Sequence, residues 1–422
     1  MALALPLSRT KIWRELLLVV ALGAAAGAGS LQGTRHLGPA VIDPHYEDFW
    51  FEADTADFVP MMTDREGRHG ETRVHPLLSL WVYPPVKALR LVFGLAPFEA
   101  VDLFLAWSAA LWAGALFAVL RLIGCRRLDA TVFTLLAIHS AAATFWFVVP
   151  ESYPVGSLTL VIALGVSALA QHRPLAPVWY VITSAMTLSG TVTNWMAGIF
   201  ATCARFPWRR ALQLTVNAFC LVVVLWGVEK AMFPSAGFFL ENPRKGKFIF
   251  HERAGGPGQI IPSFAFHSMV MPAIVDRPFK TGQPRLVTQP SAPGSASPWG
   301  AAAVWLWALL LGLGAWGACS TRTHVQFRRV LGLTLLGQLG LHLVYGDETF
   351  LYSLHFLPLL VMLAAYGALT RARPLVLGLA VALTVCARIN NQAQFHDAAT
   401  RLDQYLQTLE SERQHPAEDG GR

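Results

Sequence analysis

Charged residues are scarce in this chain. Only 14% of its 422 residues are Asp, Glu, Lys or Arg, and 54% are hydrophobic, whereas soluble domains carry roughly 25% charged residues. This deficit excludes a soluble globular fold. The net charge of +7 does not indicate nucleic-acid binding, because the Lys and Arg residues stand in short clusters between apolar runs, as topology signals do.

Cysteine is also rare, and the chain has neither an Asn-X-Ser/Thr sequon nor a repeat of fixed period. None of the cysteines lies in a long polar loop, so neither a disulfide framework nor a cysteine zinc site is indicated. The lack of a repeat argues against a solenoid. The five cysteines, all within apolar runs or at their ends, are Cys125, Cys203, Cys220, Cys319 and Cys386.

Apolar runs fill most of the chain, each close to the ~20 residues that cross a bilayer as a helix. They show no alternation of polar and apolar residues, which indicates helices rather than strands. The sequence therefore predicts an all-α, polytopic transmembrane helix bundle of about eleven spans. The runs cover residues 12–31, 100–123, 130–149, 154–170, 178–203, 211–233, 299–319, 330–345, 351–370 and 375–389.

The distribution of Lys and Arg predicts the orientation of the bundle. Basic residues before the first run keep the N-terminus in the cytoplasm. The small residues 24–30 could imitate a signal-peptidase site, but the many later runs favour a retained first helix. Segment 75–95 is apolar enough to span yet carries three prolines and two basic residues. The positive-inside rule favours an interfacial position for this segment over a crossing.

That orientation has a consequence for residues 178–203. They must run out and come back, so that the arginines at 205–210 stay inside. Two half-spans would then meet near residues 190–194. Broken helices are tolerated only where protein or a wet cavity surrounds them, so the break hints at a site. A single continuous helix with a buried Asn194 is the alternative.

The chain divides into four parts. Aromatic residues interleave with acids in the first outer loop, which predicts interfacial helices there. The parts are an N-terminal transmembrane module (1–233) containing the acidic first outer loop (32–98), an extracytoplasmic loop rich in Pro and Gly (234–298), C-terminal transmembrane helices (299–389), and a polar tail (390–422) that is helical over 398–412.

Acidic residues collect on the predicted outer face. Residues 32–73 hold nine acids against four arginines, Glu151 lies in the next outer turn, and Asp347 and Glu348 lie in a later one. Charges near lipid are costly and call for a reason. A carboxylate there can act as a general base for a hydroxyl group or hold a divalent cation. The alternative for any one acid is an ordinary solvated loop.

Other polar residues of this face are candidates for substrate binding. Histidine can bind a diphosphate, relay a proton or ligate a metal, although it often caps a helix. A helix that begins near Thr349 would bring three of the candidates onto one face. The cations at 244–245 could clamp a lipid phosphate or lie in a flexible linker. The candidates are His75, Arg73, Tyr153, Asn194, Arg244, Lys245, Glu348, Tyr352 and His355.

Several segments follow one another in a distinctive order. They are Asp43-Pro44-His45-Tyr46-Glu47-Asp48, Phe51-Glu52-Ala53-Asp54-Thr55, Val74-His75-Pro76-Leu77, Gly124-Cys125-Arg126-Arg127-Leu128-Asp129 and Pro150-Glu151-Ser152-Tyr153-Pro154. This order resembles the membrane-embedded glycosyltransferases of the C superfold, which use polyprenyl-phosphate sugars, as in the mannosyltransferase and aminoarabinose-transferase families. The resemblance covers roughly the N-terminal half, and the remainder only as a run of spans.

The resemblance implies inverting transfer of a sugar from a polyprenyl-phosphate donor to a lipid, glycan or protein acceptor. The reaction would take place in the cell envelope, on the extracytoplasmic face of the cell (inner) membrane. An acid of the first loop is the base in that family, and acids of the second turn assist it or bind metal. The catalytic candidates carried over are Asp54, Asp48, Glu47 and Glu151, with Asp54 and Glu151 as ligands if a divalent cation, Mg²⁺ or Mn²⁺, takes part.

This chain departs from the family in one respect, since the usual Asp-Glu pair of the first loop appears reversed as Glu47-Asp48. Two other functions remain open: a flippase or transporter of lipid-linked sugars, and a non-catalytic membrane subunit. A carrier tends to have polar groups at mid-membrane and repeated halves. Here the polar groups collect at one surface, which favours the transferase.

Overall fold

A computed structural model describes residues 9–38, 41, 49–241, 249–250, 252–278 and 284–414 of the chain. Within these residues the regular structure is helical except for one antiparallel hairpin, formed by β1 (Val275–Pro278) and β2 (Pro284–Val287). The prediction of an all-α protein is thus confirmed for the described part.

The helical elements follow one another closely along the chain. They are α1 (Arg9–Leu37), α2 (Thr55–Thr63), η3 (Gly70–Arg73), α3 (Leu78–Phe93), α4 (Pro97–Leu122), α5 (Arg127–Ile138), α6 (Ala141–Trp146), α7 (Tyr153–Leu169), α8 (Pro177–Gly190), η4 (Val192–Asn194), α9 (Trp195–Arg205), α10 (Trp208–Met232), η6 (Glu252–Ala254), α11 (Pro257–Pro262), η7 (Ser263–His267), α12 (Pro298–Ser320), α13 (Val325–Val344), η8 (Thr349–Tyr352), α14 (Ser353–Ala365), η9 (Tyr366–Leu369) and α15 (Arg373–Gln414).

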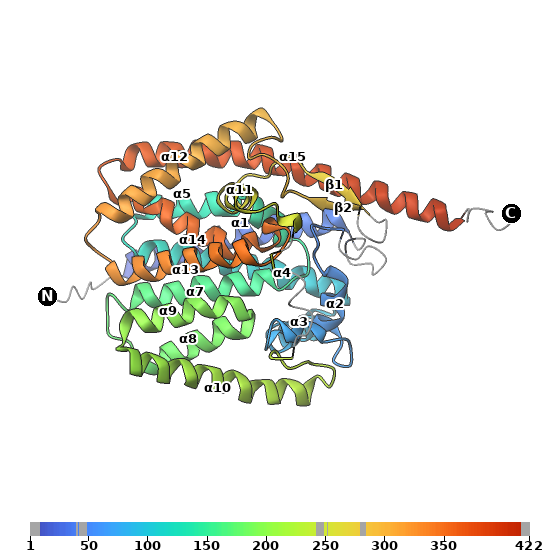
Figure 1. Ribbon diagram of the computed structural model, residues 1–422, viewed down its shortest axis with the longest axis horizontal. Helices are drawn as coiled ribbons and strands as arrows, with labels where there is room; N and C mark the ends of the chain where they lie inside the picture. The colour runs from blue at the N-terminus through green and yellow to red at the C-terminus, as the bar shows by residue number, and fades with distance from the viewer. Residues whose placement is uncertain are drawn as a thin grey trace.

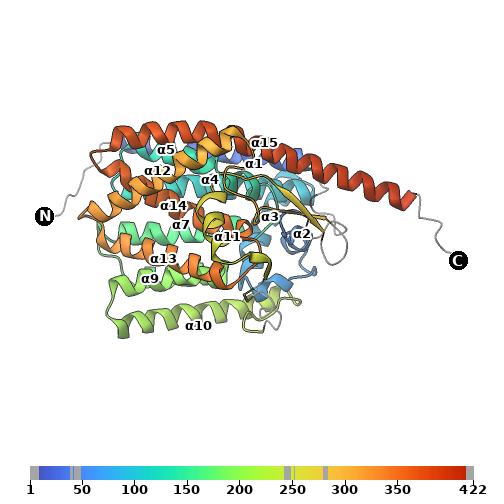
Figure 2. The same ribbon diagram turned by 45° about the horizontal axis from the view of Figure 1, so that its top comes forward.

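The long helices lie side by side in a bundle (Figure 1). In both views α10 and α15 lie on opposite edges of it (Figures 1 and 2). Helices α2 and α3 and the β1–β2 hairpin gather at the end of the bundle opposite the N-terminus. We call this the loop end. The C-terminal part of α15 projects past the bundle at the same end (Figure 2).

Six helices among the described residues are long and apolar enough to cross a membrane. A further apolar helix, α7, is shorter. Many large hydrophobic side chains are exposed on the surface of the bundle. This suits a lipid environment and would be unusual for a soluble protein. These features are those of a membrane protein. The six spans are Trp13–Leu37, Pro97–Leu122, Trp208–Met232, Pro298–Ser320, Thr349–Leu369 and Arg373–Leu409.

The predicted break near residues 190–194 is present. Helix α8 ends at Gly190 and α9 begins at Trp195, with the short η4 between them. With 14 and 11 residues, the two helices are roughly 21 and 16 Å long, short of the ~30 Å apolar core. They pack closely, since a Cβ on Gly198 would lie 2.5 Å from Ser184 Cα.

Two other segments differ from the sequence-based prediction. The run 130–149 is split into α5 and α6, because the Ser140 hydroxyl accepts a hydrogen bond from Ala143 N (3.2 Å) and so caps a new helix. The tail helix is continuous with the last span rather than beginning near residue 398. Asn391, at the expected boundary, is buried inside α15 and accepts a hydrogen bond from Met271 N (2.9 Å).

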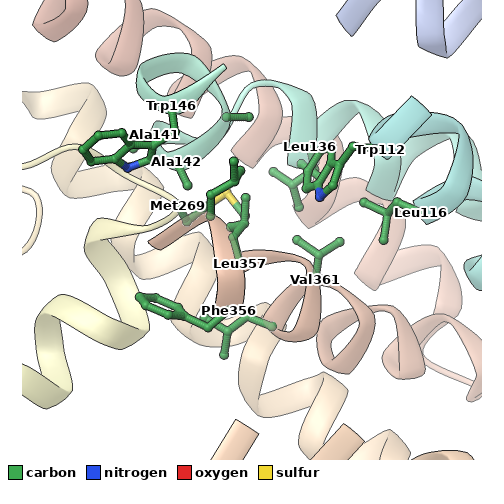
Figure 3. Close-up of a cluster of buried hydrophobic side chains, with 14 of the residues drawn as sticks. Trp112, Leu116, Leu136, Ala141, Ala142, Trp146, Met269, Phe356, Leu357 and Val361 are labelled. Atoms are coloured by element: carbon green, nitrogen blue, oxygen red, sulfur yellow. The ribbon is translucent and has the colours of Figure 1, made fainter. Parts of the chain in front are cut away.

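One hydrophobic core joins the N-terminal and C-terminal modules, with members from Leu22 of α1 to Leu402 of α15. Figure 3 shows part of it, where Ala142 of α6 and Leu357 of α14 lie near Met269. Residues 269–271 are fully buried in this core. The outer loop 234–298 is therefore anchored in the bundle here, and only the stretch around 244–245, which lies outside the described residues, keeps its interpretation as a linker.

Ion pairs between distant helices mark the end of the bundle opposite the loop end. Glu15 of α1 pairs with Arg121 (3.0 Å) and Arg127 (2.7 Å). Asp129 pairs with Arg373 at 2.7 Å. Three of the arginines that the sequence predicts to be cytoplasmic thus lie at one end of the bundle.

Candidate functional site

Two acids predicted to share a site are joined at the loop end. Asp54 N donates a hydrogen bond to Glu151 Oε1 at 3.1 Å. Glu151 Oε2 accepts from Ser152 N at 2.7 Å and from the Ser152 hydroxyl at 3.3 Å. Glu151 is only 3% exposed. Its carboxyl group therefore links the first outer loop to the turn before α7 inside the protein.

Local sequence explains how these acids are placed. Pro154 lies in the first turn of α7, where proline is favoured, so the helix begins just after Glu151 and leaves that residue in the turn. Asp54 is the residue that precedes α2, and its side chain makes no capping bond to the helix. Asp54 is partly exposed. Of the two carboxylates, that of Asp54 is the one within reach of a substrate.

Burial and hydrogen bonding shift the pKa of Glu151 in opposite directions. Burial raises the pKa of Glu151 to about 8, and the nearby charge of Glu71 adds to the rise, whereas N–H donors from Ser152 and Asp54 oppose it. Glu71 lies in η3 and also acts on the hydroxyl of Tyr153. It is a third carboxylate of the site that sequence reasoning did not single out.

Aromatic side chains form one wall beside these acids. The Tyr153 ring lies 5.9 Å from the ring of Tyr352 and 5.5 Å from that of His355. The helical turn does begin at Thr349, and it brings Tyr352 and His355 to one side, as predicted. Glu348 belongs elsewhere, because its oxygens accept hydrogen bonds from Thr288 and Gln289.

The remaining predicted polar residues hold the break between α8 and α9. His75 Nδ1 lies 2.9 Å from Gly190 O and 3.0 Å from Thr191 Oγ1. Asn194 donates to Gly156 O (3.2 Å) and accepts from Gln338 (3.1 Å). Both side chains are buried and form their hydrogen bonds within the protein. In this structure they therefore position the segments next to the site.

Arg73 packs along the segment that follows α10, since a Cβ on Gly237 would lie 2.5 Å from Arg73 Cγ. Four other candidates, Glu47, Asp48, Arg244 and Lys245, lie outside the described residues.

A small pocket of about 90 Å³ lies where the β1–β2 hairpin meets the first outer loop and the segment before η8. The two loops are joined by a hydrogen bond from Leu286 N to Phe49 O at 3.0 Å. We call it the arginine pocket. Its lining residues are Glu52, Arg253, Arg277, Pro278, Arg285, Val287, Gln289, Asp347 and Glu348.

The arginine pocket adjoins the Asp54–Glu151 pair. Glu52 lies in the pocket and Asp54 follows it by two residues, which limits their Cα atoms to roughly 7 Å apart. A carboxylate that can accept a proton and cations that can bind an anion thus occur side by side, an arrangement suited to group transfer from a phosphate.

The sequence did not single out the pocket as a site. Arg277 and Arg285 stand in a loop rich in Pro and Gly, which predicts a linker, and Glu52 is one of many acids in its loop. Their partnership depends on the fold of segments more than two hundred residues apart.

The described residues give no support for a divalent-cation site. Within the described ranges no group of three or more His, Cys, Asp or Glu side chains has the geometry to hold a metal ion. Both oxygens of Glu151 face N–H donors, which a cation would have to displace.

Comparisons of this chain with protein-family models, with curated proteins and with solved structures each found no match.

Proposed function

We propose that the chain is an integral membrane glycosyltransferase that moves a sugar from a polyprenyl-phosphate donor to a lipid, glycan or protein acceptor on the extracytoplasmic face of the cell membrane. The observation that carries the proposal is that Asp54, held through its backbone by Glu151, follows Glu52 of the arginine pocket by only two residues. Asp54 and the pocket both lie at one end of an apolar helical bundle, where a lipid-linked donor can present its phosphate.

In the proposed reaction Asp54 takes the proton from the acceptor hydroxyl. The acceptor oxygen forms a bond to C1 of the sugar as the bond from C1 to the phosphate oxygen breaks, and the phosphate leaves with the electron pair. Attack opposite the leaving group inverts the configuration at C1. Arginines of the pocket stabilise the departing phosphate by charge-assisted hydrogen bonds.

The other residues of the site position and surround the reactants. Glu151 holds the backbone of Asp54 through a 3.1 Å hydrogen bond, so we assign it a positioning role. The rings of Tyr153 and Tyr352 lie 5.9 Å apart in an edge-to-face arrangement and form an aromatic wall of the site. The carboxylates and arginines of the site lie together at the loop end, which favours a transferase over a flippase.

The proposed topology follows from the same reasoning. With α8 and α9 counted separately, the bundle crosses the membrane about eleven times, starting from a cytoplasmic N-terminus. Helices α2 and α3 would lie in the outer interface. The 16 residues of α3 are too few to span comfortably, and its exposed residues Leu91, Val92 and Phe93 suit contact with lipid.

Transfer can be measured with purified protein in detergent and a radiolabelled pool of polyprenyl-phosphate sugars. We expect Asp54→Asn to lower kcat by about 10²–10⁴-fold, the usual contribution of a general base. Asp57→Asn is a matched control, because Asp57 lies one turn further along and pairs only weakly with exposed Arg68, at 3.4 Å. Equal rates for wild type and Asp54→Asn would reject the proposed base, and no transfer by wild type from any donor of the pool would reject the function.

A further inference from the structure

The arginine pocket contains a buried ion pair between two of its own side chains. Arg285 Nη1 lies 2.7 Å from Glu52 Oε1, and the two side chains are 7% and 12% exposed. A carboxylate at this distance satisfies a guanidinium in the same way as a phosphate oxygen does. In this structure Glu52 therefore occupies a place on Arg285 that a phosphate ligand would need.

The backbone of this segment adopts an uncommon conformation. Phe51 and Glu52 have φ angles of 51° and 66°, in the left-handed region that L side chains rarely adopt. Buried aromatic contacts hold Phe51, whose ring lies 5.3 Å from that of Phe350. Glu52 is held by its ion pair. Loss of that pair would remove one of the contacts that keep the segment before Asp54 in this conformation.

A second partner for Glu52 is already present. Glu52 and Asp347 share a hydrogen bond, and burial together with the charge of Asp347 raises the pKa of Glu52 to about 8. Two carboxyl groups so close hold a proton between them readily. Glu52 can therefore leave Arg285 without becoming an isolated buried charge.

Among the described residues, Asp347 and Glu348 are the other acids that line the pocket. Glu348 is engaged by Thr288 and by backbone N–H groups, which fix it as part of the wall. Arg253 and Arg277 also line the pocket. An entering phosphate would meet three guanidinium groups, of which the most buried is paired with Glu52.

We propose that Glu52 occupies the position of a phosphate ligand on Arg285. When the phosphate group of a lipid enters the arginine pocket, it displaces Glu52 from Arg285. The exchange is non-covalent: the phosphate takes the guanidinium, and Glu52 turns to Asp347. Because Glu52 lies two residues before Asp54, the exchange couples occupation of the pocket to the position of Asp54, the proposed base. That coupling rests on the proposed function, whereas the exchange itself does not.

The exchange predicts opposite effects of removing the two partners. Binding of dodecyl phosphate to the full chain in a nonionic detergent is measured by calorimetry. We expect Arg285→Gln to weaken binding about tenfold or more, because it removes a phosphate ligand. We expect Glu52→Gln to tighten binding about tenfold, because it removes the competitor. Glu66→Gln, at an exposed acid of the same loop, should leave the affinity unchanged.

Two further arms keep the outcome clear. Glu52→Asp retains the charge but shortens the reach to Arg285, so it should also tighten binding, and it serves if the Gln variant does not fold. Inorganic phosphate, titrated in parallel, should bind more weakly than dodecyl phosphate if the ligand is a lipid headgroup; equal binding would identify free phosphate as sufficient and overturn that part of the proposal.

The proposal is rejected if wild type does not bind dodecyl phosphate, or if both Glu52 variants bind it no more tightly than wild type. Neither result depends on sugar transfer. Tightened binding by the Glu52 variants of a protein that transfers no sugar would retain the exchange and reject only the glycosyltransferase.

Discussion

Replacing Glu151 by Gln distinguishes a base from a residue that positions the base. Gln keeps one acceptor oxygen and introduces an NH₂ donor, so either Asp54 N or Ser152 N, now bonded at 3.1 and 2.7 Å, loses its acceptor. An unmet buried donor costs about 1–3 kcal/mol. A displacement of about 1 Å in a catalytic group can lower a rate about 100-fold. We therefore expect Glu151→Gln to lower kcat about 100-fold without changing KM for the donor.

A double-mutant cycle of transfer rates tests this role. If Glu151 acts through Asp54, Asp54→Asn/Glu151→Gln is no slower than Asp54→Asn alone. Glu99→Gln is the control, because exposed Glu99 also accepts a backbone hydrogen bond, from Ala96 N at 2.9 Å, but lies in another turn. A double variant slowed by the product of the two single effects would refute the positioning role, since it would show that Glu151 contributes independently.

Thermal unfolding in detergent tests two further features. The pKa of Glu151 is raised from 4.5 to about 8 in the folded chain, so the folded state binds this proton more tightly than the unfolded state does. Wild type should therefore lose stability relative to Glu151→Gln as the pH rises from 4.5 to about 8. Curves of Tm against pH that run parallel for the two proteins would contradict this. Gly314→Ala should lower Tm, by the equivalent of about 1–3 kcal/mol, because its Cβ would lie 2.4 Å from Leu363 O, whereas nothing lies within 4 Å of a Cβ on Gly312. Gly312→Ala should leave Tm unchanged or slightly raised, and equal shifts for the two variants would contradict the packing of α12.

Those parts of the fold that depend on local pattern could be predicted from the sequence. Apolar runs gave the helices, and the placement of arginines required a break within residues 178–203, which occurs between Gly190 and Trp195. Sequence patterns predict the wrong helix boundaries where the hydrogen bonds of individual side chains decide where a helix ends. Buried Asn391 is bonded to the 269–271 segment, so α15 continues where polar residues suggested a new element.

The site was predictable only in part. The meeting of Asp54 with Glu151 followed from placing both acids on one face, because outer loops of a bundle share one end. The pairing of Glu52 with Arg285, by contrast, depends on a hairpin that bonds to the first outer loop through Phe49 O. No periodicity in the sequence records a contact between segments so far apart.

The most direct test of the central claim is the sidedness of the loop end. Single cysteines at Glu66, exposed at the loop end, and at Thr323, exposed between α12 and α13 at the opposite end, are placed in a chain whose five native cysteines are replaced. Intact cells are then treated with a membrane-impermeant maleimide. The account predicts labelling of Glu66→Cys in intact cells and of Thr323→Cys only after lysis; the reverse pattern would place the carboxylates and arginines in the cytoplasm and contradict an extracytoplasmic transferase.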